Sequence, residues 1–112
     1  MSCFQEPDFR IFETANLPIR VRQQGALEGY KLIITSIKQL NVLLEFNSDD
    51  PNINVDVDEN LIYLHLSQED TSKFKKGPAI LQINVYYHDE EREASSTAEI
   101  YIGDNLHKEV MP

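Results

Sequence analysis

Apolar and polar residues alternate along most of this chain, and a period of two is typical of β-strands with one buried face. The clearest case is residues 79–87, AILQINVYY, where every second side chain is apolar and Gln82 and Asn84 lie on the opposite face. No segment keeps the i, i+3, i+4, i+7 spacing of an amphipathic helix for long. The pattern therefore predicts an all-β protein.

Segments of this kind recur about every ten residues, between turns rich in Asn, Asp and Gly. The expected strands are 9–12, 17–22, 30–37, 42–46, 53–57, 61–66, 79–87 and 94–102. Seven to eight short strands in 112 residues predict one domain, residues 1–112, folded as an immunoglobulin-like two-layer β-sandwich. Pro18 lacks a backbone donor, so its strand is expected at a sheet edge, as is the short strand 53–57. The predicted core consists of Ile19, Val21, Leu32, Ile34, Leu44, Phe46, Ile62, Leu64, Phe74, Leu81, Ile83, Val85 and Ile100.

The charged stretch 66–77, LSQEDTSKFKKG, interrupts the alternation and predicts one short helical turn near residues 68–74. Ser67 and Asp70 have the spacing of a capping box, which satisfies backbone donors at the start of a helix. Gly77 is expected to end the turn in a left-handed conformation. Phe74 is the lone apolar side chain between Ser67 and Gly77, so we expect it to anchor the turn to the core. We interpret the stretch as a connection between strands.

The charge balance restricts the class of partner. The chain carries 10 basic and 19 acidic residues, for a formal charge of −9. This charge repels phosphate backbones and anionic lipids, so we expect no nucleic-acid or membrane partner and favour a neutral or basic protein. Cys3 is the only cysteine, so neither an internal disulfide nor a cysteine zinc motif is expected. The first ten residues do not resemble a signal peptide, and no apolar run is long enough to span a bilayer, so we expect neither secretion nor a membrane span.

Acidic residues concentrate in the segment 47–60, NSDDPNINVDVDEN. Calcium takes oxygen ligands, which this segment offers in Asp49, Asp50, Asp56, Asp58 and Glu59. Their spacing fits no EF-hand loop, and Asn and Asp side chains favour turns. We therefore interpret the segment as solvated turns without a metal site.

The sequence contains no recognisable catalytic arrangement. His65, His88 and His107 are scattered without the spacing of metal ligands. The nucleophile elbow, the Walker loop and the dinucleotide-binding glycine motif are all missing. We therefore expect no catalytic, cofactor-binding or metal-binding residues and no enzymatic activity.

Three tyrosines are candidates for an interface. Tyr63, Tyr86 and Tyr101 point away from the predicted core by the alternation of their strands. Tyrosine is enriched at protein interfaces. Packing among neighbours on the outer face of a sheet explains the three rings equally well.

The segment after Gly103, DNLHKEVMP, is a second candidate. It is too short to build a core, yet it carries the apolar residues Leu106, Val110 and Met111. We expect these side chains to pack either on a partner, which includes another copy of the chain, or on the same domain.

A longer motif runs from the charged stretch toward the end of the chain. A strand is followed by a QEDT-x-KF-x-x-G turn, a strongly alternating strand, a polar hairpin, and a closing strand that ends in Gly and a Leu-x-x-x-Val tail. Over about residues 61–110 this arrangement resembles a family of short proteins encoded among the virion structural genes of phages and prophages of Gram-positive bacteria. The matching positions are Gln68, Glu69, Asp70, Thr71, Lys73, Phe74, Gly77, Ser95, Gly103, Leu106 and Val110. One departure is Pro78, which follows Gly77 where the family more often has proline before the glycine.

The resemblance implies a virion-associated protein of the tail or baseplate region, and the N-terminal half is similar to the small immunoglobulin-like domains of baseplate upper proteins. Such a protein is made in the bacterial cytoplasm and works without catalysis, by assembly with other virion proteins or with itself. The alternative is a carbohydrate- or calcium-dependent adhesion module that uses sheet-face tyrosines and the acidic segment. The lack of tryptophan weighs against that alternative, because sugar platforms favour large aromatic faces.

Overall fold

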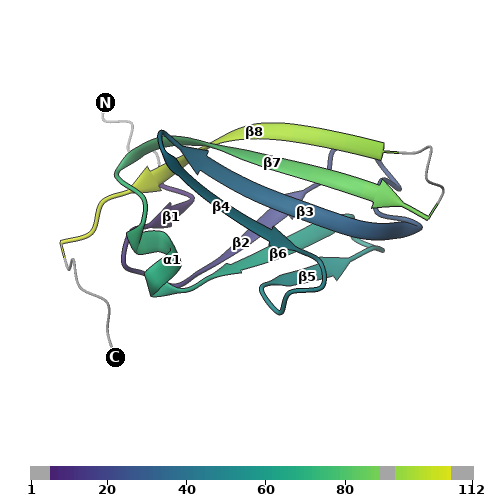
Figure 1. The fold of residues 1–112 in the computed structure, drawn as a ribbon, viewed down its shortest axis with the longest axis horizontal. Helices are drawn as coiled ribbons and strands as arrows, with labels where there is room; N and C mark the ends of the chain where they lie inside the picture. The colour runs from purple at the N-terminus through teal and green to yellow at the C-terminus, as the bar shows by residue number, and fades with distance from the viewer. Residues whose placement is uncertain (1–5, 89–92, 107–112) are drawn as a thin grey trace.

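The computed structural model describes residues 6–88 and 93–106. These residues form eight strands and one short helix, arranged as two facing sheets (Figure 1). The larger sheet has the order β1 (Phe9–Arg10), β8 (Glu93–Gly103), β7 (Gly77–Tyr87), β3 (Tyr30–Gln39) and β4 (Val42–Asn47). The smaller sheet has the order β2 (Ala15–Arg20), β6 (Leu61–Leu66) and β5 (Ile53–Asp56). The expected two-layer all-β sandwich with one short helical turn is confirmed.

Neighbouring strands are antiparallel except for β1, which pairs in parallel with the end of β8. The strands expected at edges, β2 and β5, are the two edges of the smaller sheet. The larger sheet ends at β4 on one side and at β1 beside β8 on the other.

The core lies between the inner faces of the two sheets. The inner face of β7 is buried as the alternation predicts, and Ile19, Ile62, Leu64 and Ile100 are buried as expected. The prediction for β3 was wrong, because Leu32 and Ile34 are half-buried and not part of the core. The buried residues of β3 are Ile33, Thr35, Ile37 and Gln39.

The cause of that error is the composition of β3, which is apolar on both faces, so that its alternation does not identify the inner one. Pairing with β7 decides the matter, since Ile33 lies opposite Val85 and Ile37 opposite Leu81, both on the inner face. Three further predicted core residues are partly buried and pack against the core: Val21, Leu44 and Phe46.

The short helix α1 (Gln68–Ser72) has the predicted capping box. The Ser67 hydroxyl accepts from the Asp70 N–H at 3.1 Å, and the Asp70 carboxylate accepts from the Ser67 N–H at 3.0 Å. Phe74 is buried, and its ring lies edge-on against Phe9 with 5.9 Å between centroids. Gly77 does not end the helix, because Lys73 caps it and Gly77, with φ 137°, begins β7.

Candidate interaction surfaces

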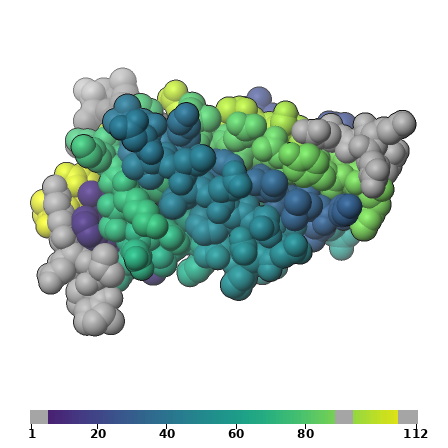
Figure 2. All heavy atoms as spheres, in the orientation of Figure 1, coloured from purple at the N-terminus to yellow at the C-terminus, as the bar shows by residue number. Residues whose placement is uncertain are grey.

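The hairpin between β3 and β4 exposes a leucine in an unfavourable backbone conformation. Leu40 and Asn41 form the connection. Leu40 has φ 53°, which glycine or asparagine adopts more readily than a bulky residue. Its side chain is 79% exposed. In Figure 2 the tip of this hairpin, in blue, projects at the upper left of the molecule.

Two other exposed apolar side chains lie on the outer face of the larger sheet near Leu40. Leu43 of β4 is 56% exposed and Ile80 of β7 is 44% exposed. Both lie opposite Lys38 of β3, Leu43 on one side and Ile80 on the other. Leu43, Lys38 and Ile80 therefore form a row across β4, β3 and β7. We call Leu40, Leu43 and Ile80 the hairpin patch.

Gln39 holds the base of this hairpin. It is buried, and its side-chain amide bonds to the backbone of Lys75, in the connection between α1 and β7, and of Pro78 near the start of β7. The Gln39 side chain therefore fixes the charged stretch that precedes β7 to the end of β3, next to Leu40.

The structure places the three candidate tyrosines on different surfaces. Tyr63 lies on the outer face of the smaller sheet, opposite Pro18 and Asn54. Tyr86 and Tyr101 lie on the outer face of the larger sheet toward opposite ends of β7, because Tyr86 pairs with β3 near its start and Tyr101 lies opposite Pro78. All three are half-buried. The tyrosines therefore do not form one surface.

Of the three apolar tail residues, Leu106 is fully exposed, with a relative accessibility of 104%. Val110 and Met111 lie outside the described residues. The role of the tail in an interface therefore stays a prediction.

The acidic segment forms turns in the manner expected of Asn and Asp. The Asp50 carboxylate accepts from the Asn47 N–H at 3.0 Å, and the Asp56 carboxylate accepts from the Glu59 N–H at 3.2 Å. Within residues 6–88 and 93–106, no three His, Cys, Asp or Glu side chains gather in a way that could hold a metal ion. No helix in the same part of the chain is long and apolar enough to cross a membrane.

Several residues of the motif that begins at Gln68 have structural roles. The buried Thr71 donates its hydroxyl to the Glu13 carbonyl at 2.9 Å, which ties α1 to the chain between β1 and β2. Gly103 leaves room for Pro7, since a Cβ at Gly103 would lie 2.7 Å from the Pro7 ring. These positions, with Phe74, maintain the fold at the end of the sandwich that carries α1 (Figure 1).

Sequence reasoning missed the hairpin patch. The available signal was Leu40 itself, a leucine in the tight connection of QLNV between two alternating segments, where glycine or asparagine is usual. Leu43 and Ile80 were assignable to the outer faces of their strands by alternation, but their proximity depends on the strand order of the larger sheet.

No family model and no curated protein matches this chain. A solved structure with a similar shape is the endo-β-1,4-mannanase from Thermotoga petrophila, with a TM-score of 0.49 and 10% sequence identity. The match covers 91% of this chain and 18% of the mannanase chain. We draw no conclusion about function from a likeness of this size.

Proposed function

We propose that this chain is a non-enzymatic structural or accessory component of a phage particle, in the tail or baseplate region, and that it works by binding other virion proteins. The phage assignment rests on the resemblance of residues 61–110. The binding role is supported by one structural observation, the exposed Leu40 held at a positive φ.

Leu40 costs the isolated chain stability in two ways. A bulky residue in this backbone region costs about 1–3 kcal/mol. Its side chain also leaves apolar surface in water, and at 79% exposure it gains little from packing within the chain. A partner surface that covers the hairpin patch would remove the apolar area of all three side chains from water. Burial of that area in an assembly offsets both costs.

The test compares particle incorporation of Leu40→Gly with that of the unchanged chain. Glycine relieves the positive φ, so the purified variant should melt at the same temperature as the parent or higher. Phage particles are purified from the strain that encodes the chain, and an antibody against the chain is used to quantify it in each preparation. We expect the parent to co-purify with particles and Leu40→Gly to be depleted at least tenfold.

Val57→Ala is the matched control, because Val57 is also an exposed apolar residue but follows β5 of the smaller sheet. It should be incorporated like the parent. Absence of the parent chain from purified particles would contradict the phage assignment. Equal incorporation of Leu40→Gly and the parent would contradict the role of the hairpin patch.

A further inference from the structure

β8 has an accessible edge over most of its length. β1 pairs only with Ile102 and Gly103 at the end of β8. Within the described part of the chain, no strand covers the preceding residues on the side away from β7. Residues 95–99 are all exposed, on both faces of the sheet. We call residues 95–99 of β8 the open edge.

The open edge presents a row of backbone hydrogen-bonding groups. At Tyr101, the N–H donates to the Asp8 carboxylate at 2.7 Å and the carbonyl accepts from the Asp8 N–H at 2.8 Å. Both groups of Tyr101 therefore point away from β7. Alternate residues of a strand direct their backbone groups to the same side. Ser95, Thr97 and Glu99 consequently direct their N–H and C=O groups outward, as a template for a further strand.

The other edges carry features that hinder strand addition. β2 has an exposed proline, Pro18, which removes a donor from its edge. β5 has only four residues and β4 only six, whereas β8 has eleven. Between Ala94 and Glu99, by contrast, β8 has no proline, lysine or register shift. Strand addition is therefore least hindered at the open edge.

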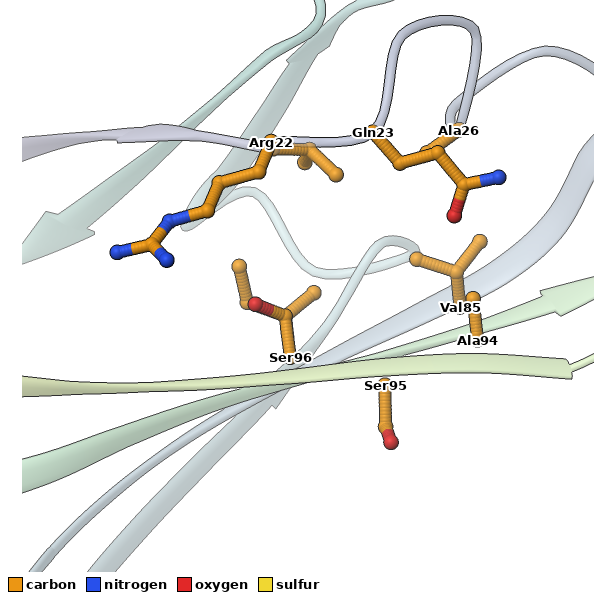
Figure 3. A pocket seen from close by; sticks show the side chains of 9 residues that line it. Arg22, Gln23, Ala26, Val85, Ala94, Ser95 and Ser96 are labelled. Atoms are coloured by element: carbon orange, nitrogen blue, oxygen red, sulfur yellow. The ribbon is translucent and has the colours of Figure 1, made fainter.

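A hollow of about 200 Å³ opens beside the open edge, between β8 and the loop that follows β2. In Figure 3, Val85, Ala94 and Ser96 point from the larger sheet toward the segment that carries Arg22, Gln23 and Ala26, across this hollow. The hollow exists because the smaller sheet does not extend over β8, whose inner-facing Ser96 and Ala98 stay exposed. A cavity of about 150 Å³ holds a benzene-sized group. The hollow therefore has room for one large apolar side chain.

We propose that the open edge binds an extended segment of a partner protein, which adds to the larger sheet as a further strand. Main-chain hydrogen bonds to Ser95, Thr97 and Glu99 supply the affinity, and an apolar side chain of the segment fills the hollow. Basic side chains occupy the alternate positions on the outer face, where Glu99 is exposed and the chain has a net charge of −9. A second copy of this chain fits less well, because it carries the same charge. The inference stands independently of the phage assignment.

The test uses the full chain and a fluorescein-labelled, acetylated and amidated peptide of alternating lysine and valine, seven residues long with lysine at both ends. Its affinity is measured by fluorescence anisotropy. We expect saturable binding at least tenfold tighter than that of a block peptide with the same composition, four lysines followed by three valines. Equal affinity for the two peptides would reduce the interaction to charge attraction and overturn the proposal.

A matched pair of variants tests the site. Thr97→Pro removes an outward N–H without removing a bond to β7, so the fold should persist by circular dichroism while affinity falls at least tenfold. Thr97→Val keeps the backbone donor and should bind like the parent. Ser96→Leu fills the hollow from within and should also weaken binding. Unchanged affinity in Thr97→Pro would overturn the proposal.

Three further measurements cover the remaining outcomes. If Thr97→Pro does not fold, peptides N-methylated at alternate residues replace it. Methylation of the residues whose N–H groups face the open edge should abolish binding, and methylation of the other residues should not. Equal effects of the two methylation patterns would overturn the proposal. Light scattering that shows a dimer of the parent, lost in the Ser96→Leu variant, would assign the edge to a second copy instead. A tenfold gain in peptide affinity on deletion of residues 1–5 would assign it to the chain itself. Either result would overturn the partner assignment.

Discussion

Gln39 and Lys75, which are 36 residues apart in the sequence, exchange two hydrogen bonds. The Gln39 Nε2 donates to the Lys75 carbonyl, and the Lys75 N–H donates to the Gln39 Oε1, each at 2.7 Å. Gln39 is buried at the end of β3. Lys75 lies outside the strands, and the Gln39 side chain provides the hydrogen-bond partners for its main chain that a neighbouring strand would otherwise provide. This pair joins the charged stretch to the end of β3, where the β3–β4 hairpin begins.

Replacement of this glutamine should destabilise the fold. In Gln39→Leu the Lys75 N–H and C=O lose their partners, and we expect the free energy of unfolding to fall by about 2–3 kcal/mol. Urea denaturation measures the change. Gln82→Leu is the control, because Gln82 is exposed on the outer face of β7, and it should change stability by less than about 0.5 kcal/mol. A similar loss of unfolding free energy in both variants would show that the hydrogen bonds between Gln39 and Lys75 do not stabilise the fold.

Phe74 should be the main anchor of the turn that follows β6. Its ring is buried against Phe9, so Phe74→Ala should lower the free energy of unfolding by about 3–5 kcal/mol. Phe74→Leu retains most of the apolar volume and should cost less. The same denaturation experiment applies. A loss below about 1 kcal/mol in Phe74→Ala would be incompatible with a buried ring.

Replacement of a fully buried threonine by valine should raise the free energy of unfolding at Thr35 and lower it at Thr71. The hydroxyl of Thr35 is buried without a hydrogen-bond partner among the described residues, whereas that of Thr71 donates to Glu13. Valine has nearly the shape of threonine, so Thr35→Val should raise the free energy of unfolding by about 1 kcal/mol. Thr71→Val leaves the Glu13 carbonyl unpaired and should lower it by about 1–3 kcal/mol. Losses of equal size in both variants would contradict this assignment.

Gly103 should tolerate no side chain. A Cβ at this position would lie 2.7 and 2.8 Å from two ring carbons of Pro7, so Gly103→Ala should cost about 1–3 kcal/mol through overpacking. Pro7→Gly removes the ring and should recover part of that loss in the double variant. The coupling energy from the four melting curves measures the contact. Strictly additive losses would mean that Pro7 is not the obstacle.

The sequence predicted an element well wherever its two faces differ in polarity. In β7 the apolar and polar positions alternate, and its inner face is the one that alternation predicts. In β3 both faces are apolar, so only pairing with β7 determines that Ile33 and Ile37, rather than Leu32 and Ile34, face the core. The capping box of Ser67 and Asp70 was predictable because it is local.

Features that depend on contacts between distant segments were beyond the sequence pattern. The hairpin patch requires β4, β3 and β7 to be neighbours in the larger sheet. The open edge requires β1 to cover only the last part of β8. The burial of Leu27 in the loop after β2 was likewise not apparent, because a lone leucine between glycines carries no periodicity.

The parallel pairing of β1 with β8 has a consequence for how the protein is made. Strand order in the larger sheet places β8 between β1 and β7, so this sheet cannot be completed while the ribosome is still adding residues before Gly103. At roughly 5–20 residues per second, the segment from His88 to Gly103 takes about one to three seconds to synthesise. Until β8 has been synthesised, β7 lacks its partner on one side, so the larger sheet forms in full only after that interval. The smaller sheet uses only residues up to Leu66 and is available earlier, so the two layers of the sandwich mature at different times.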